Sequence, residues 1–334
     1  MKAIKLHFTT PVHFGRGREE PDKSELIYHS DSLKSAIYSI GVHFFEEWKN
    51  EKKFCDSFRI SSCFPFAKDE FFLPKPQLKR KIIISDLSED KTSKKVKKIE
   101  FFEKTVFENF INTSNDFFKI NLSNVTPNGV FVSKENIEQK KHKEFFKTEV
   151  QQRVKVPLEW ENKDSDPFYI DRIYFEKECG LYFIAEFDNS EIENQVLRAL
   201  KLLGENGIGT DRSVGNGLFN FNVDRDVSEF SFNINSLHDN YLLLGLYLPN
   251  ENEHKAINFD KSSWSLIKRG GYIAGSEIEE FMHLRKKSVY MFGEGSILKS
   301  SLALKGKTEN LSPDWNDEKM HPVWRDGQCL ILKI

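Results

Sequence analysis

The sequence predicts an α+β protein whose first unit has the element order βαββαβ. Three observations support this class: apolar residues alternate at residues 3–8, two aromatic-rich strands fall within residues 168–187, and an amphipathic helix at residues 190–203 precedes a glycine-rich loop and a last strand. With a helix after the first strand, this order is the ferredoxin-like arrangement. Its four-stranded antiparallel sheet is also the architecture of the RRM.

The composition indicates a globular chain with two domains. Its 334 residues are 39% hydrophobic and 13% aromatic, enough to fill a sizeable core. We expect a first domain at residues 1–226 and a second, degenerate ferredoxin-like domain at residues 227–334. The formal net charge is −2, so a nucleic-acid surface must be a local patch. Without a long apolar run, a signal peptide or a lipidation motif, the sequence predicts a soluble, cytoplasmic protein with no membrane partner.

Cysteine and acid spacing give no sign of a bound metal. Cys55, Cys63, Cys179 and Cys329 are scattered and form no Cys-x-x-Cys pair. Reduced, partly buried thiols are therefore expected, without a disulfide framework or a zinc site. Asp211 has no second acid beside it, so a metal ion would find only one hard ligand there. We predict no cofactor and no metal.

The first helix is expected to begin with Ser30 or Asp31 as its N-cap and to bury one apolar stripe. That stripe consists of Leu33, Ala36, Ile37, Ile40, Phe44 and Trp48. Lys34 falls in the first turn, where exposed N–H groups can hold an anion. Ordinary helix capping is the alternative interpretation of this start.

Two stretches separate this helix from the aromatic strands. Residues 56–78 contain short strand-like pieces interrupted by prolines. Residues 79–155 form a lysine-rich insertion, and such a stretch is most often a solvated or mobile face. The strands at residues 168–175 and 181–187 are then expected to pair with each other through a turn at residues 176–180.

The glycine-rich loop follows the helix that ends at Gly204. Five of the 18 glycines lie within residues 204–217, a density that predicts positive φ angles and N–H groups facing a ligand. A phosphate suits such a loop because Arg212 adds a charged fork and Thr210 and Ser213 add hydroxyls. A helix C-cap followed by structural turn glycines is an equal alternative. The spacing excludes a P-loop, and the preceding helix excludes a dinucleotide-binding loop.

The wording Gly-Ile-Gly-Thr-Asp-Arg-Ser-x-Gly-x-Gly, between a helix and a strand, resembles the signature loop of the RAMP superfamily of CRISPR ribonucleoprotein subunits. Within it, the loop is similar to that of the type III-A (Csm) subunit at the 5′ end of the guide RNA. Four further blocks resemble the same subunit, in the same order: His29-Ser30-Asp31-Ser32-Leu33, Lys268-Arg269-Gly270-Gly271, Gly293-Glu294-Gly295-Ser296 and His321-Pro322-Val323-Trp324-Arg325.

The resemblance implies a non-catalytic RNA-binding scaffold of a type III-A effector in antiviral defence. Such a subunit anchors the repeat-derived 5′ handle of the crRNA, bridges the large polymerase-like subunit to the backbone subunits, and meets target RNA only indirectly. It also implies that a hairpin in the insertion reaches across the guide RNA. The RNA-binding residues it implies are Gly207, Gly209, Thr210, Asp211, Arg212, Ser213, Gly215, Gly217, Arg16, Ser30, Ser32, Lys34, Lys268, Arg269, His321 and Arg325.

A metal-independent endoribonuclease that processes repeat RNA is the alternative function. Some relatives cut RNA with an N-terminal histidine, since imidazole can accept a proton from a ribose 2′-OH. His7, His13 and His29 are the candidates here, but no spacing requires a partner, so we predict no catalytic residue. A third interpretation is a protein-interaction module without RNA. The RRM consensus is missing, and Phe219 and Phe221 are expected in the core.

Overall fold

The computed structural model confirms the α+β class and describes most of the chain. The described residues are 1–15, 22–85, 87–137, 144–155, 166–235, 239–273, 281, 284–314 and 321–334. Arg16, one of the predicted RNA-binding residues, lies outside them. Among the described helices, none is long and apolar enough to cross a membrane.

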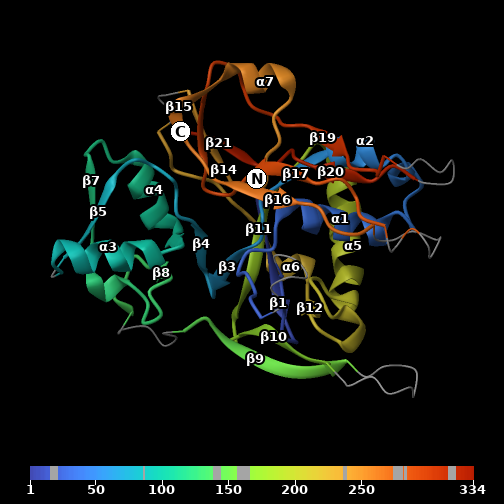
Figure 1. Cartoon of the computed structure of the whole chain (residues 1–334), viewed down its shortest axis with the longest axis horizontal. Coiled ribbons are helices and arrows are strands. Elements are labelled where there is room, and N and C mark those ends of the chain that lie inside the picture. Colours follow the sequence, from blue (N-terminus) through green and yellow to red (C-terminus); the bar gives the residue numbers. More distant parts are fainter. Residues whose placement is uncertain are drawn as a thin grey trace.

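The first unit is built on one large sheet (Figure 1). Its strands follow the order β12 (Phe219–Asn220), β1 (Lys2–Phe8), β11 (Cys179–Phe187), β3 (Phe64–Ala67), β4 (Glu70–Pro74), β6 (Phe101–Glu103) and β8 (Phe131–Val132). In addition, β2 (Phe58–Ile60) pairs with β11, and β13 (Val227–Glu229) pairs with β1 just beyond the expected domain boundary. Each neighbouring pair among β12, β1, β11 and β3 is antiparallel.

Both faces of this sheet are buried. On one face, Ile4 and Phe183 pack with α1 (Ser30–Gly41) and α5 (Ser190–Asn206). On the other face, Tyr182 and Ile184 join a core that includes side chains of the insertion and of the second unit. Double burial explains why β11 is almost continuously apolar. Phe219 and Phe221 lie in the helix-side core, as predicted.

The predicted pairing of residues 168–175 with residues 181–187 is wrong. Both segments are strands, but β10 (Asp166–Phe175) pairs along its whole length with β9 (Phe146–Lys155), and β11 pairs with β1, β2 and β3. A short turn between two strands favours a hairpin, yet β11 buries more apolar surface at the centre of the large sheet than it would in a hairpin with β10. The ribbon β9–β10 lies below β1 and β12 in Figure 1.

The insertion is a folded lobe, although its lysine-rich composition suggested a mobile face. It contains α3 (Glu89–Lys98), α4 (Lys104–Asn112), η2 (Leu122–Asn124) and the parallel pair β5 (Lys81–Ile84) and β7 (Phe117–Ile120). Its own Phe102, Phe107 and Phe110 are fully buried. The lysines of α3 remain on its outside, which reconciles the composition with a packed core.

The second unit contains a four-stranded sheet with the order β15 (Ile257–Ser263), β18 (Ile297–Ser300), β14 (Asn240–Leu243) and β21 (Ile331–Lys333). Two ribbons flank it, one of β16 (Leu266–Arg269) with β17 (Val289–Phe292) and one of β19 (Thr308–Asn310) with β20 (Trp324–Asp326). The remaining short helices are η1 (Glu46–Lys49), α2 (Glu51–Asp56), η4 (Arg212–Val214), α6 (Val223–Asp226) and α7 (Glu251–Ala256).

Candidate nucleic-acid interface

The Gly loop, residues 207–217, has the predicted backbone. Gly207, Gly209, Gly215 and Gly217 all have positive φ angles, between 76° and 90°. Three of these positions also lack space for a side chain. A Cβ on Gly217 would lie 1.9 Å from the Ile208 carbonyl oxygen, one on Gly207 would lie 2.6 Å from that of Asn216, and one on Gly209 would lie 2.7 Å from that of His13. These glycines are therefore required by the loop's own packing.

Many of the loop N–H groups bind within the chain. The N–H of Ile208 donates to the Gly217 carbonyl (3.0 Å), that of Thr210 to His13 (3.1 Å) and that of Gly217 to Pro11 (2.9 Å). The loop is thus fastened to residues 11–13, as the structural interpretation of the glycines requires. Within the described chain, the N–H groups of four residues make no hydrogen bond: Gly209, Asp211, Arg212 and Ser213.

These free N–H groups lie where the loop is most exposed. Asp211 has a left-handed backbone, with φ of 60°, and is followed by the single turn η4. Thr210, Arg212 and Ser213 are exposed, and a Cβ on Gly215 would have no neighbour within 4 Å. Arg212 forms no ion pair with any described residue. The outer half of the loop therefore presents a guanidinium without an ion pair among the described residues, the Ser213 hydroxyl and several N–H donors, while the Thr210 hydroxyl donates to the His13 carbonyl at 3.4 Å.

Asp211 ties the loop to the ribbon β9–β10. Its Oδ2 lies 3.1 Å from Nη1 of Arg153, and both side chains are about 30% exposed. Asp211 therefore has a partner outside the loop, whereas the sequence analysis considered it only as part of the loop. The pair positions the ribbon beside the loop.

The other sequence blocks meet at a second place, the joint between the two units. The joint consists of residues from the start of α1 and from the second unit: His29, Asp31, Lys34, Arg269, Glu294, Arg325 and Asp326. At its centre the fully buried Asp31 accepts hydrogen bonds from Nε of Arg269 (2.8 Å) and Nη1 of Arg325 (2.8 Å). Burial alone would raise the pKa of Asp31, but Arg269 and Arg325 hold that pKa well below its usual range.

Lys34 and the neighbouring serines are also committed to internal contacts. Nζ of Lys34 lies 2.8 Å from Asp326 and donates to the carbonyl oxygens of Cys55 and Phe58. The Ser30 hydroxyl accepts a hydrogen bond from the Leu246 N–H at 3.0 Å. Arg269 also donates to the Ser32 hydroxyl at 2.7 Å.

His29 is held as a cation between two acids. Nδ1 donates to Glu294 at 2.8 Å, and Nε2 donates to Glu25 at 3.1 Å. Burial would lower the pKa of His29, but the charge of Glu294 and the hydrogen bonds to both acids outweigh it and raise the pKa to about 10. Glu294 also accepts a hydrogen bond from the Ser62 hydroxyl.

The structure thus sorts the described members of the predicted RNA-binding set into three groups. The loop residues stay together on one exposed surface. Ser30, Ser32, Lys34, Arg269 and Arg325 instead bind one another or their neighbours at the joint. Lys268 and His321 are exposed elsewhere on the second unit. The blocks carry complementary charges, with acids at 31 and 294 and arginines at 269 and 325. This was the signal that could have revealed the joint.

The three candidate histidines have different surroundings. His29 is a buried cation, and Nδ1 of His13, itself buried, lies 2.6 Å from the Asp171 carbonyl. His7 is half-exposed, with Nε2 3.1 Å from Asp226. The described residues hold no cluster of three or more potential metal ligands.

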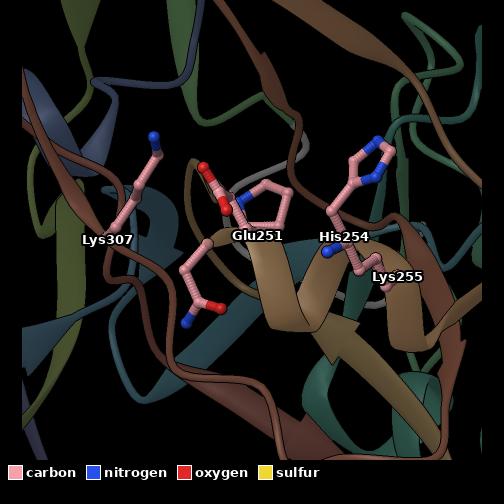
Figure 2. Close-up of a pocket in the computed structure, with 6 residues that line it drawn as sticks. Glu251, His254, Lys255 and Lys307 are labelled. Carbon is pink, nitrogen blue, oxygen red and sulfur yellow. The ribbon is translucent and has the colours of Figure 1, made fainter.

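A pocket of about 280 Å³ lies on the second unit, away from the Gly loop. Figure 2 shows Glu251, His254 and Lys255 on α7 beside it, with Lys307 on a neighbouring segment. In Figure 1, α7 is at the top, whereas β12 and the ribbon β9–β10 are at the bottom. The pocket is therefore not part of the loop surface.

Comparison with known proteins identifies the class of protein. The model of the RAMP superfamily matches residues 5–220, well over half of the chain. The chain therefore belongs to the RAMP superfamily. Residues 237–334 match the model of the CRISPR Csm4 C-terminal domain, which confirms the resemblance drawn from the sequence blocks.

Individual relatives agree with this family over nearly the whole chain. The chain is 26% identical to the "CRISPR system Cms protein Csm4" of Methanocaldococcus jannaschii, over 99% of this chain and 96% of the relative. It is 24% identical to the protein of the same name from Mycobacterium tuberculosis, over 97% and 94%.

Two solved structures share the fold. One is the Csm3-Csm4 subcomplex in the type III-A CRISPR-Cas interference complex, with a TM-score of 0.65, 21% identity and coverage of 100% of this chain and 99% of that chain. The other is a Csm1-Csm4 cassette in complex with cA4, with a TM-score of 0.57, 17% identity and coverage of 100% and 97%.

Proposed function

We propose that this chain is the Csm4-type subunit of a type III-A CRISPR effector, a non-catalytic scaffold that anchors the 5′ handle of the crRNA. It would bridge the large polymerase-like subunit to the backbone subunits, as the names of the matching complexes suggest. The observation that carries the RNA-binding part is Arg212, an exposed guanidinium with no described ion-pair partner, beside free N–H groups of the Gly loop.

The strand orders support two ferredoxin-like domains with a boundary near residue 226. In chain order, the first unit's strands are β1, β3, β11 and β12. Across the sheet they follow one another as β12, β1, β11 and β3, which is the fourth, first, third and second strand of the chain order. The second unit repeats this pattern with β21, β14, β18 and β15. It is degenerate because no helix is found between β18 and β21 among the described residues. A repeated antiparallel pattern is what two βαββαβ units would produce.

The chemistry of the loop suits a single RNA strand. Arg212 can bind a phosphate through two parallel N–H bonds, and the hydroxyls of Thr210 and Ser213 can reach phosphate or 2′-OH oxygens. Arg212 and the Ser213 hydroxyl have no partner among the described residues, so binding them would break no described contact, whereas the Thr210 hydroxyl would have to release the His13 carbonyl, 3.4 Å away. The joint, in contrast, holds its charges in buried pairs and would serve to fix the two domains relative to each other. This scaffold would work in the cytoplasm.

The test is charge reversal at Arg212. The complex is purified from cells that express the neighbouring subunits, and the guide RNA per complex is measured by RNA sequencing and absorbance. Arg212→Glu should lose the guide while its thermal unfolding midpoint stays at the wild-type value. Arg198→Glu is the matched control, because Arg198 is also an exposed arginine but lies on α5, and this variant should keep the guide. Full guide occupancy in Arg212→Glu would remove the central claim.

A further inference from the structure

Arg172 on β10 is a buried cation that has no hydrogen-bond or ion-pair partner among the described residues. Its side chain is only 9% exposed, and Nε and Nη2 are both enclosed without a hydrogen bond. An enclosed guanidinium that lacks an acceptor carries an uncompensated desolvation penalty. Buried polar groups in folded proteins nearly always have a partner, so an unpaired one indicates either a strained site or a place for a ligand.

The nearby acids do not neutralise Arg172. Glu149 lies opposite it in the β9–β10 register, yet the two form no ion pair. Asp171, the preceding residue, points to the other face of the ribbon, and its Oδ2 accepts a hydrogen bond from the Ser24 N–H. Within the described chain, the guanidinium therefore has no carboxylate to bind.

Arg172 lies on the face of the ribbon that is turned towards the Gly loop. On β9, every second residue points to the same face of the ribbon, so Glu149 and Arg153 share a face. Arg172 lies directly opposite Glu149 on the neighbouring strand and therefore shares that face too. From this face Arg153 reaches Asp211 in the loop.

Residues 11–13 connect the two sites. On one edge of this segment, Val12 pairs with Ile173, the residue after Arg172. On its other edge, the carbonyls of Pro11 and His13 accept hydrogen bonds from the Gly loop. The loop and β10 are thus two strand spacings apart, roughly 10 Å. The loop side holds another unpartnered group, Nδ2 of the buried Asn216.

We infer that Arg172 is a second phosphate receptor, which binds the backbone of the strand whose neighbouring phosphates contact Arg212. The identity of that strand as RNA rests on the proposed function. A phosphate would supply the acceptors that Arg172 lacks, and the charge-assisted bonds would offset the penalty of burial. The segment 11–13 would lie beneath the strand, between the two receptors.

The experiment measures how salt weakens the binding of a synthetic single-stranded repeat RNA to the full chain. Each phosphate contact contributes about 0.7 to the slope of log K against log salt concentration for a single strand. Arg172→Met should weaken binding and lower this slope by about 0.7. Lys147→Met, on the same ribbon, removes an exposed lysine paired with Glu176 and should leave the slope unchanged.

Stability without RNA separates a receptor from a structural residue. Because Arg172 has no partner in the described part of the chain, replacing it with the apolar side chain of methionine should leave the thermal unfolding midpoint unchanged or raise it. A fall of the midpoint in Arg172→Met, with an unchanged salt slope in the fraction that remains folded, would overturn the inference. Arg172→Lys, which keeps the charge, should retain the slope.

The outcomes distinguish this inference from the proposed function. If Arg212→Gln lowers the slope and Arg172→Met does not, the inference is wrong and the proposed function stands. If the wild-type chain binds no RNA, the proposed function fails, and inorganic pyrophosphate then tests Arg172 directly. Pyrophosphate should raise the thermal midpoint of the wild type but not of Arg172→Met. An equal rise in both proteins, or none in either, would overturn the inference.

Discussion

The joint and the Gly loop both contain an aspartate–arginine pair, but the surroundings of the two pairs differ. At the joint, Asp31 is fully buried and is shared by Arg269 and Arg325. At the loop, Asp211 and Arg153 are each about 30% exposed, and Arg212 beside them has no described partner. The same residue types therefore stabilise the chain in one region and stay available to a ligand in the other.

This difference follows from the dielectric environment. Charges taken out of water interact strongly and must be paired, so a buried network fixes the geometry of the elements that contribute to it. Charges near water interact weakly and can exchange partners at small cost. The joint suits a contact that keeps the two units in one orientation, and the loop suits the phosphate-binding surface that we propose.

The largest expected effect is at Asp31. Asp31→Ala leaves two buried guanidinium groups without their shared acceptor, and this should lower the free energy of unfolding by about 3–5 kcal/mol. Urea denaturation followed by tryptophan fluorescence measures the change. Asp260→Ala, at an exposed aspartate of β15, is the control and should alter stability by less than about 0.5 kcal/mol. A loss at Asp31 as small as the control's would show that the joint does not hold the two units together.

A smaller effect, dependent on pH, is expected at His29. The pKa is raised from 6.5 to about 10 in the folded chain. Its stabilising contribution is therefore complete below about pH 6.5 and is lost as pH rises towards 10. The wild type's free energy of unfolding should exceed that of His29→Gln by roughly a few kcal/mol at pH 6 and by little at pH 10. A difference that does not change with pH would mean that His29 is not held as a cation.

The sequence predicts local structure well and long-range contacts poorly. Periodicity correctly placed β1 and the helix before the Gly loop, because each depends on neighbours a few residues away. The predicted N-cap of α1 is wrong, since His29 takes that position and Ser30 is already the first helical residue. It missed the pairing of β10 with β9 because a strand's partner is chosen by the burial of the whole sheet. Arg269 bonds to Asp31 across 238 positions, so its role at the joint could not be read from its own basic turn.

The smallest expected effect is at the Asp211–Arg153 pair, and it is the sharpest test of the comparison. Because both side chains are partly exposed, Arg153→Gln should change the free energy of unfolding by less than about 1 kcal/mol. Its effect should instead appear in binding, since Asp211 loses its partner and can then compete with phosphate for Arg212. Guide retention should fall in Arg153→Gln and recover when Asp211→Asn is added, because the competing charge is gone. Were Arg153→Gln to lose as much stability as Asp31→Ala, the loop would be a second structural joint, and the distinction between the two regions would disappear.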